Sequence, residues 1–333
     1  MSNASAPGKI ILFGEHAVVY NRPALAVPVL QVHADVLVTD SSTDSSTDSI
    51  ADSRIRTDKS IRDWHSRIFI EAPDVGIAAT LEALLGEHPQ HPLGVVIINV
   101  FQFLEIPSPP SLHIKIRSSI PVASGLGSGA AVSVALIRAL SSTVHRPLST
   151  VEINNLAYEI EKLHHGTPSG IDNTVIVYAK PVYFVRGQPI ETFSVGKPFT
   201  LVIGNTGINA PTKESVGDVR KLWQAEPARW ERVFDAVGEI ARQARAAIET
   251  GDVAALGPLM DANHTLLQKL TVSSVELDRL VDAAKSAGAA GAKLSGGGRG
   301  GNMIALVSSQ RVDEVVEALR GAGAESTIIT TIQ

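Results

Sequence analysis

A glycine-rich segment that runs directly into a stretch of small residues constrains this chain more than any other feature. Residues 121–131 read Pro-Val-Ala-Ser-Gly-Leu-Gly-Ser-Gly-Ala-Ala. Glycine lets a backbone approach a ligand closely, and the free amide groups at the start of a helix point toward an anion. Ser128 adds a hydroxyl that suits a phosphate or a metal ion. The segment predicts an anion-binding turn that leads into a helix over 130–140.

Two common phosphate-binding patterns fit this segment poorly. The P-loop pattern requires a lysine that does not follow Gly129. The dinucleotide-binding pattern is nominally met over 125–130. However, Pro121 interrupts the strand that should precede it, and no acidic residue stands near position 145 to hold a ribose. A dehydrogenase is therefore disfavoured, whereas a glycine-rich helix entry without a ligand stays open.

A second cluster places five glycines within residues 296–301. It lies between an expected helix over 275–286 and an expected strand over 303–307. Ordering so many glycines costs conformational entropy, so a close-packed turn that shapes a site is favoured over a plain linker. The helix over 312–320 and the strand over 327–332 complete a β-α-β run. This run predicts a second domain of the α+β class, with helices on one face of a sheet.

Two carboxylates flank a tight turn in the middle of the chain. Glu161 stands near the end of an amphipathic helix that a capping box at 149–152 begins, and Asp172 follows a Gly-Thr-Pro-Ser-Gly turn. Such a pair can serve one site, one carboxylate holding Mg²⁺ and the other accepting a proton. A helix-end Glu and a turn Asp without function stay open as the alternative. The adjacent histidines 164 and 165 diverge on a helix, and they are interpreted as structural or as supporting other site residues, not as metal ligands.

The first sixteen residues carry a third unusual arrangement. Lys9 precedes an apolar strand over 10–13, and Glu15 and His16 follow it. A lysine beside a carboxylate can lower the pKa of a neighbouring group and neutralise charge that develops in a reaction.

Composition excludes several classes of protein. With 29 basic and 34 acidic residues the formal charge is −5, and no Lys/Arg block provides a nucleic-acid footprint. No apolar run approaches the roughly 20 residues of a membrane helix, and the N-terminal segment lacks a signal-peptide pattern. The absence of cysteine excludes disulfides, cysteine metal sites and thiol catalysis. A cytoplasmic protein is expected, with neither a nucleic-acid nor a membrane partner. The polar stretch 40–54 is expected to form an exposed loop.

The remaining pattern divides the chain into two domains. Strands are expected over 24–39, 113–117, 182–185 and 200–203, and a helix over 76–87. The region 187–198 is the expected boundary, after which 212–270 is mostly helix-forming. We therefore expect an N-terminal domain over 1–195 and a C-terminal domain over 196–333.

Taken in order, these segments resemble the motifs of the GHMP small-molecule kinases. The matching stretches are 7–16, 121–131 and 293–301, and the resemblance spans nearly the whole chain. Each motif is moderately specific by itself, and the ordered set is highly specific. The resemblance implies an α+β fold. Its N-terminal domain would be similar to ribosomal protein S5 domain 2, and its C-terminal domain would be ferredoxin-like.

The resemblance also implies an activity. Family members transfer a phosphoryl group from ATP, with Mg²⁺, to a small alcohol. Residues 14–19, 165–173 and 205–213 resemble the members that act on mevalonate, which implies phosphorylation of its 5-hydroxyl. Other acceptors stay open, among them phosphomevalonate, the mevalonate 3-hydroxyl, galactose and homoserine. A non-catalytic binding protein with this fold and a homodimer also stay open.

The resemblance further implies a role for individual residues. Asp172 and Lys9 correspond to the catalytic carboxylate and its lysine, and Glu161 and Ser128 to metal ligands. The nucleotide would contact Ser118, Ala123, Ser124, Gly125, Leu126, Gly127, Ser128 and Gly129. The acceptor would contact Glu15, His16, Thr212 and Gly297.

This chain departs from the family pattern at two positions. Gly129 stands where a second serine usually binds Mg²⁺, so Ser128, water or Glu161 with phosphate oxygens would have to hold the ion. Arg299 stands at a variable or glycine position of the third motif, where it would face either solvent or a phosphate.

Overall fold

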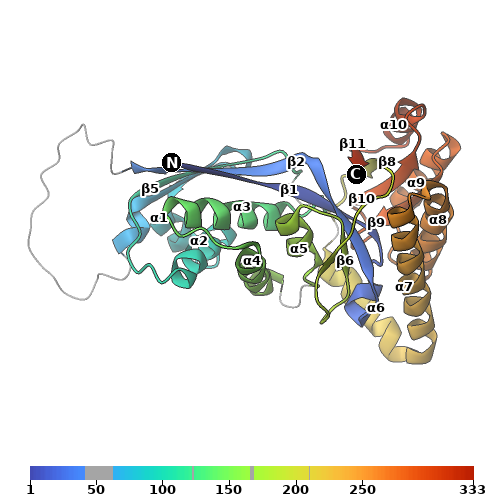
Figure 1. The fold of residues 1–333 in the computed structure, drawn as a ribbon, viewed down its shortest axis with the longest axis horizontal. Helices are drawn as coiled ribbons and strands as arrows, with labels where there is room; N and C mark the ends of the chain where they lie inside the picture. Colours follow the sequence, from blue (N-terminus) through green and yellow to red (C-terminus); the bar gives the residue numbers. More distant parts are fainter. Residues whose placement is uncertain (42–62, 122–123, 166–168, 210) are drawn as a thin grey trace, which may run out of the picture. The chain divides into compact units, whose positions relative to one another are not determined.

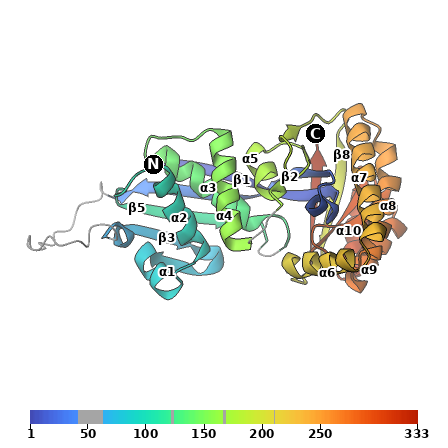
Figure 2. The same ribbon diagram turned by 90° about the horizontal axis from the view of Figure 1, so that it is seen from below.

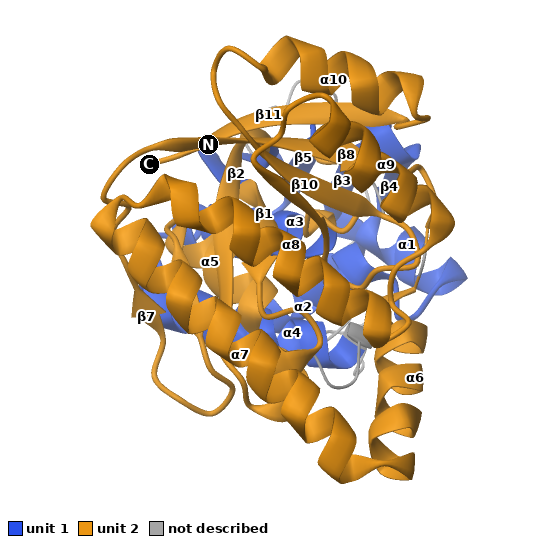
Figure 3. Cartoon of the chain, turned by 90° about the vertical axis from the view of Figure 1, so that its right-hand side faces the viewer, with its two compact units in different colours: residues 1–6, 33–119, 129–168 blue, residues 7–32, 120–128, 169–333 orange. Residues whose placement is uncertain are grey.

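The computed structural model describes residues 1–41, 63–121, 124–165, 169–209 and 211–333. The chain forms two compact units, shown in different colours in Figure 3. Unit 1 comprises residues 1–6, 33–119 and 129–168, and unit 2 comprises residues 7–32, 120–128 and 169–333. Most of the polar loop expected over 40–54 lies outside the described residues, as do Ala123 and the turn residues 166–168.

Unit 1 is built on a sheet with the strand order β4-β3-β5-β2, in which only the β3–β5 pairing is parallel. Its helix α2 packs against α4, as Figures 1 and 2 show. The strands are β2 (Ala24–Asp40, from His33 onward in this unit), β3 (Ile68–Ala72), β4 (Ile77–Thr80) and β5 (Leu112–Ser118). The helices are η3 (Asp63–Arg67), η4 (Pro73–Val75), α1 (Leu81–Glu87), α2 (Pro92–Phe103), α3 (Ser128–Thr143) and α4 (Thr150–His165).

The helix expected over 76–87 is wrong in its first half. Gly76 has a φ of 70°, which turns the chain, and residues 77–80 then pair as strand β4 with β3. The side chain of Thr80 accepts a hydrogen bond from the backbone amide of Ala83, so α1 begins only at Leu81. Strand pairing within the sheet therefore overrides the local helical pattern.

Unit 2 contains two groups of strands. The first part of β2 pairs with β6 (Val182–Phe184), which in turn pairs with β7 (Glu191–Thr192). β1 (Ser2–Phe13) also pairs with β2. A separate antiparallel sheet has the order β11-β8-β10-β9. Its strands are β8 (Phe199–Asn205), β9 (Gly291–Ser295), β10 (Asn302–Val307) and β11 (Ser326–Ile332).

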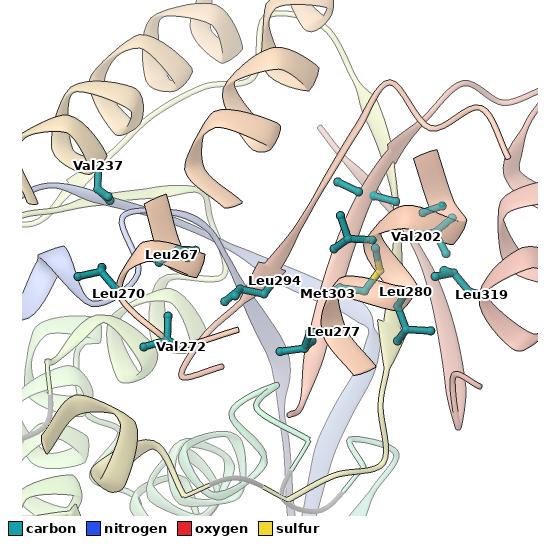
Figure 4. Close-up of a cluster of buried hydrophobic side chains, with 14 of the residues drawn as sticks. Val202, Val237, Leu267, Leu270, Val272, Leu277, Leu280, Leu294, Met303 and Leu319 are labelled. Carbon is teal, nitrogen blue, oxygen red and sulfur yellow. The ribbon is translucent and has the colours of Figure 1, made fainter. Parts of the chain in front are cut away.

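Helices cover this antiparallel sheet. α9 contacts β9 and β10, α10 contacts β8 and β11, and α8 contacts β9, while α7 packs on α8 as Figure 1 shows. The helices of unit 2 are η1 (Ala17–Tyr20), α5 (Ile171–Tyr178), α6 (Thr212–Ala225), α7 (Pro227–Thr250), α8 (Val253–Lys269), α9 (Val275–Ser286) and α10 (Val312–Gly321). Figure 4 shows part of the core between strands and helices, with Val202, Leu294 and Met303 among the buried side chains. The expected β-α-β run with helices against a sheet is confirmed.

Two glycines allow α8 and β9 to touch backbone to backbone. A methyl group built on Gly257 would lie 2.2 Å from the carbonyl oxygen of Ala290, and one on Gly291 would lie 2.2 Å from the carbonyl oxygen of Gly257. Neither position accepts a side chain unless the backbone moves. Among the described residues, no helix is long and apolar enough to cross a membrane.

We expect Gly257→Ala to lower the free energy of unfolding by about 3 kcal/mol, because the added methyl group forces α8 away from β9. Gly217→Ala is the matched control, since Gly217 also lies within a helix but has open space where a methyl group would go. This control should raise the free energy of unfolding by about 0.5–1 kcal/mol. Urea unfolding measures the change in the free energy of unfolding for both variants. Equal changes would contradict the close approach of α8 and β9 at Gly257.

Candidate active site

A buried lysine and a partly exposed aspartate form the centre of the candidate site in unit 2. The Nζ atom of Lys9 lies 3.0 Å from Oδ2 of Asp172, and the two side chains are 5% and 40% exposed. Strand β1 carries Lys9, whose backbone amide donates to the carbonyl of Leu126. Asp172 is the second residue of α5, where the helix dipole favours a negative charge. The pair therefore holds a carboxylate that reaches solvent while a buried ammonium compensates its charge.

The glycine-rich segment packs directly over this lysine. Gly127 has a φ of 77°, and a methyl group built on it would lie 3.0 Å from Cδ1 of Ile176 and 3.1 Å from Cγ of Lys9. The side chain of Asn302 donates to the carbonyl of Ser124, whose own hydroxyl donates to the carbonyl of Pro121 at 2.8 Å. The hydroxyl of Ser124 is therefore engaged within the turn. The segment is therefore anchored to β1 through Leu126 and to β10 through Ser124.

The second glycine cluster forms a close-packed turn between β9 and β10. A methyl group on Gly298 would lie 1.9 Å from the carbonyl oxygen of Val272, and the amide of Arg299 donates to that same carbonyl at 2.8 Å. Just before the turn, the hydroxyl of Ser295 donates to the carbonyl of Ile11 on β1 at 2.7 Å. The turn is therefore fixed to the strand that carries Lys9.

His16 lies at the meeting point of the first and third motifs. Its Nε2 atom is 3.0 Å from the carbonyl oxygen of Gly297, and its backbone has a φ of 60°. Burial lowers the pKa of His16 from 6.5 to about 4, so the ring is neutral at pH 7. Because a carbonyl only accepts, Nε2 must carry the ring proton, which leaves a lone pair on Nδ1. That atom is buried and has no hydrogen-bond partner among the residues that the structure describes.

Glu15 occupies a different environment from its neighbour. Its side chain has no solvent exposure, and its Oε1 atom forms an ion pair with Lys293. Its Oε2 atom accepts a hydrogen bond from the side chain of Asn263 at 2.9 Å. Both carboxylate oxygens therefore contact protein groups, whereas the resemblance implied a contact with the acceptor.

Thr212 and Gly297 touch each other. A methyl group built on Gly297 would lie 2.7 Å from the hydroxyl oxygen of Thr212, the exposed first residue of α6. Because the carbonyl of Gly297 also holds His16, three of the four residues predicted to bind the acceptor form a continuous set of contacts.

The guanidinium of Arg299 binds α6. It lies 2.6 Å from Oδ2 of Asp218, and its backbone has a φ of 61°. Lys221 and then Arg299 hold the pKa of Asp218 well below its usual range, at about 2. In this structure Arg299 therefore faces a helix carboxylate.

Three predicted site residues belong to unit 1, and their place in the site stays a prediction. Ser118 ends β5, and its amide donates to Oδ2 of Asp74 at 2.7 Å. Gly129 is the exposed second residue of α3, and Glu161 is a partly buried residue of α4. The described residues contain no group of three or more His, Cys, Asp or Glu that would hold a metal by themselves.

Sequence reasoning assigned no role to Lys293, Asn263 or Asn302, all of which the structure places around the site. The sequence offered one indication for Lys293, which stands among small and apolar residues. A lysine in such a strand is buried, and a buried charge requires a partner. Asparagines carry no comparable signal, since they are common on surfaces.

Comparison with known proteins shows the family of the chain. The model of the N-terminal domain of the GHMP kinases matches residues 95–180, and that of their C-terminal domain matches residues 244–325. The chain is 36% identical over 327 residues to the mevalonate kinase of Pyrococcus abyssi (strain GE5 / Orsay), covering 96% of this chain and 92% of that protein. It is 33% identical over 319 residues to the mevalonate kinase of Aeropyrum pernix (strain ATCC 700893 / DSM 11879 / JCM 9820 / NBRC 100138 / K1), again covering 96% and 92%. The chain belongs to the GHMP kinase family.

The fold agrees with this assignment. A crystal structure of L. major mevalonate kinase in complex with R-mevalonate superimposes with a TM-score of 0.80 at 29% identity, covering 100% of this chain and 96% of that one. The expected α+β class and the family resemblance are confirmed, and the chain is an ATP-dependent small-molecule kinase. The two matched stretches lie on either side of 187–198. The division into domains over 1–195 and 196–333 stays a prediction.

We expect Gly127→Ala to lower kcat by about 10–100-fold, because the new methyl group displaces Lys9 from Asp172 and small misplacements are costly in catalysis. Gly187→Ala is the matched control. Its φ of 78° imposes the same backbone strain, but a methyl group there meets nothing within 4 Å. Steady-state kinetics of the purified variants measure the difference, and equal losses of kcat would show that strain alone is responsible.

The depressed pKa of His16 has a consequence for stability in acid. The unfolded chain takes up this proton near pH 6.5 and the folded chain only near pH 4. The free energy of unfolding should therefore fall as the pH falls through this window, by up to about 1.4 kcal/mol per pH unit from this group. His16→Gln should flatten the dependence, whereas His264, whose pKa burial also lowers, contributes with the same sign in both proteins. Urea unfolding at pH 7, 6 and 5 tests this, and identical slopes would contradict it.

Proposed function

We propose that this kinase phosphorylates the 5-hydroxyl of mevalonate with ATP, forming 5-phosphomevalonate and ADP. The Lys9–Asp172 pair carries the proposal, because it places a solvent-reaching carboxylate beside a buried ammonium at 3.0 Å. The substrate assignment is supported by relatives named mevalonate kinase that align over nearly the whole chain.

Asp172 is the proposed general base that accepts the proton of the acceptor hydroxyl. Its exposed carboxylate can orient the acceptor hydroxyl and take its proton as the oxygen attacks the γ-phosphorus. Lys9 keeps the site electrically balanced and fixes the direction of the carboxylate. ADP departs as the new phosphate ester forms, so the proton held by Asp172 is the one to be returned to solvent.

The glycine-rich segment is the proposed binding site for the triphosphate. Gly125 and Gly127 both have positive φ angles, at 79° and 77°, which is a conformation that exposes backbone amides. Ser128 is the first residue of α3, and the backbone amides of a first helical turn have no partner within the helix. An acidic protein can bind ATP in this way because the phosphates contact amides instead of a basic surface. Ser124 and Leu126 belong to the same segment, and nucleotide contacts of Ser118, Ala123 and Gly129 stay predictions.

The donor set is compatible with Mg²⁺. Glu161 would supply a carboxylate and Ser128 a hydroxyl, and Mg²⁺ is commonly held by one or two carboxylates together with substrate phosphates and water. That these two residues meet at one ion stays a prediction. A protein cage of several acidic residues is not required. The ion would neutralise charge on the β- and γ-phosphates, while the chain's own groups position the acceptor.

His16 is proposed to bind the acceptor alcohol through a hydrogen bond whose direction its tautomer sets. Its Nδ1 lone pair accepts a hydrogen bond from a hydroxyl and cannot donate one to a carboxylate. Thr212 and the backbone at Gly297 lie next to His16 and are proposed to contact the acceptor as well. Glu15 acts through His16, because its own oxygens are occupied by Lys293 and Asn263. A cytoplasmic location and a homodimer stay predictions.

A coupled assay of ADP release tests the substrate. Mevalonate, phosphomevalonate, galactose and homoserine are supplied separately with ATP and Mg²⁺, and the position of the new phosphate is read by ³¹P and ¹³C NMR. We expect turnover of mevalonate alone, with the phosphate on the 5-oxygen. Turnover confined to another acceptor, or a product phosphorylated at the 3-oxygen, would overturn the proposal. ATP binding without turnover of any acceptor would favour a binding protein.

Asp172→Asn should lower kcat by about 10²–10⁴-fold, which is the usual contribution of a general base. The dissociation constant of ATP should change by less than threefold, since Asp172 handles the acceptor. Asp313→Asn, in the first turn of α10, is the control and should leave kcat unchanged. Steady-state kinetics and calorimetric ATP titration measure the two quantities. A variant that turns over mevalonate near the wild-type rate would remove Asp172 from the mechanism.

A further inference from the structure

A buried ion pair lies directly behind the proposed acceptor site. Glu15 and Lys293 are both 0% exposed, and they join the loop after β1 to the middle of β9. Isolated charges are very costly to bury. Replacing such a pair by apolar residues is often neutral or stabilising, so stability by itself does not explain why the pair is present.

The hydrogen bonds of the pair leave its atoms little freedom. The ammonium of Lys293 donates to Oε1 of Glu15 and to the carbonyl of Leu294 at 2.7 Å, and it lies 5.9 Å from the centre of the Phe13 ring. Asn263 holds the other oxygen of Glu15. Hydrogen bonds to charged groups are strong in a low-dielectric interior and restrict these side chains, while Oδ1 of Asn263 has no partner among the described residues. The position of the Glu15 side chain is therefore tightly defined.

The residue next to Glu15 is the one that needs such support. His16 has a φ of 60°, a left-handed conformation that is strained for a residue with a side chain. The amide of Ala17 donates to the carbonyl of Glu15 at 2.6 Å and closes a tight turn centred on His16. Two further features fix this turn, namely the anchored side chain of Glu15 and the contact of the His16 ring with the carbonyl of Gly297. Lys293 and Gly297 belong to the same short segment, so β9 and its following turn supply both anchors.

We propose that Lys293 is a positioning residue for the acceptor alcohol. Its buried ion pair with Glu15 holds the backbone of His16 in the conformation that presents the Nδ1 lone pair to the acceptor hydroxyl. The inference rests on the proposed function, and it assigns to Lys293 a role in acceptor affinity that is separate from the Lys9–Asp172 chemistry.

Two variants separate positioning from stability. Lys293→Met leaves the carboxylate of Glu15 buried without a partner, so the thermal midpoint should fall and the KM for mevalonate should rise at least tenfold. The double variant Glu15→Leu/Lys293→Met removes both charges, so the midpoint should recover. Its KM for mevalonate should stay at least tenfold above wild type, because no side chain then holds His16. The KM for ATP should stay within twofold in both.

Lys285→Met is the matched control. Lys285 forms an ion pair with Asp261 at 2.7 Å in the same unit, on α9, but with a partly exposed side chain. Loss of this pair should leave both KM values unchanged. A double variant that recovers the wild-type KM for mevalonate together with the midpoint would show that the ion pair is merely structural. If the single variant does not fold, the double variant still gives this answer.

The tautomer of His16 provides a readout that does not depend on turnover. In the wild type, ¹⁵N NMR of the imidazole should show the proton on Nε2 alone. In the double variant the ring should exchange between tautomers, because it is no longer held against Gly297. An unchanged single tautomer would overturn the positioning role. If the wild type proves active on another alcohol, the proposed substrate fails, and the positioning role is then judged by the KM for that alcohol.

Discussion

Close approach of backbone at glycine is the constraint on which the site in unit 2 depends. Gly127 lets the glycine-rich segment rest on the side chain of Lys9, and Gly297 lets its turn touch Thr212. Gly298 places the same turn against the carbonyl of Val272. A side chain at any of these positions would separate the elements that carry the proposed catalytic lysine, the proposed acceptor residues and the proposed phosphate-binding amides.

Unit 2 contains ion pairs that differ in their exposure to solvent and in the role proposed for them. Lys9 and Asp172 form a pair in which one member reaches solvent, so the carboxylate is available for chemistry. Glu15 and Lys293 form a pair without exposure, which suits a fixed support instead of a reactive group. Arg299 and Asp218 tie the glycine turn to α6 at a partly exposed position. Complete burial therefore sets the Glu15–Lys293 pair apart from the other two pairs.

Local pattern predicted much of the fold, and it failed where pairing with distant strands decided the outcome. The amphipathic spacing after the capping box at 149–152 corresponds to α4, and the small-residue run after Gly129 to α3. Residues 77–80 were expected to be helical, but they form strand β4, which pairs with β3. Strand β9 was not predicted, because Lys293 interrupts its apolar pattern. This lysine can be buried because Glu15 forms an ion pair with it.

The sequence alone determined the family, the α+β class and the kinds of residue that the chemistry requires, because ordered motifs and glycine clusters are local features of the chain. Only the tertiary structure decided which of these residues meet. It brought Lys9 to Asp172 and placed the ring of His16 against Gly297. It also enclosed the carboxylate of Glu15, which the motif had associated with the acceptor. Such partners lie far apart in the chain, 281 residues in the case of His16 and Gly297. Burial sets both their charge state and their hydrogen bonds, so no local pattern contains that information.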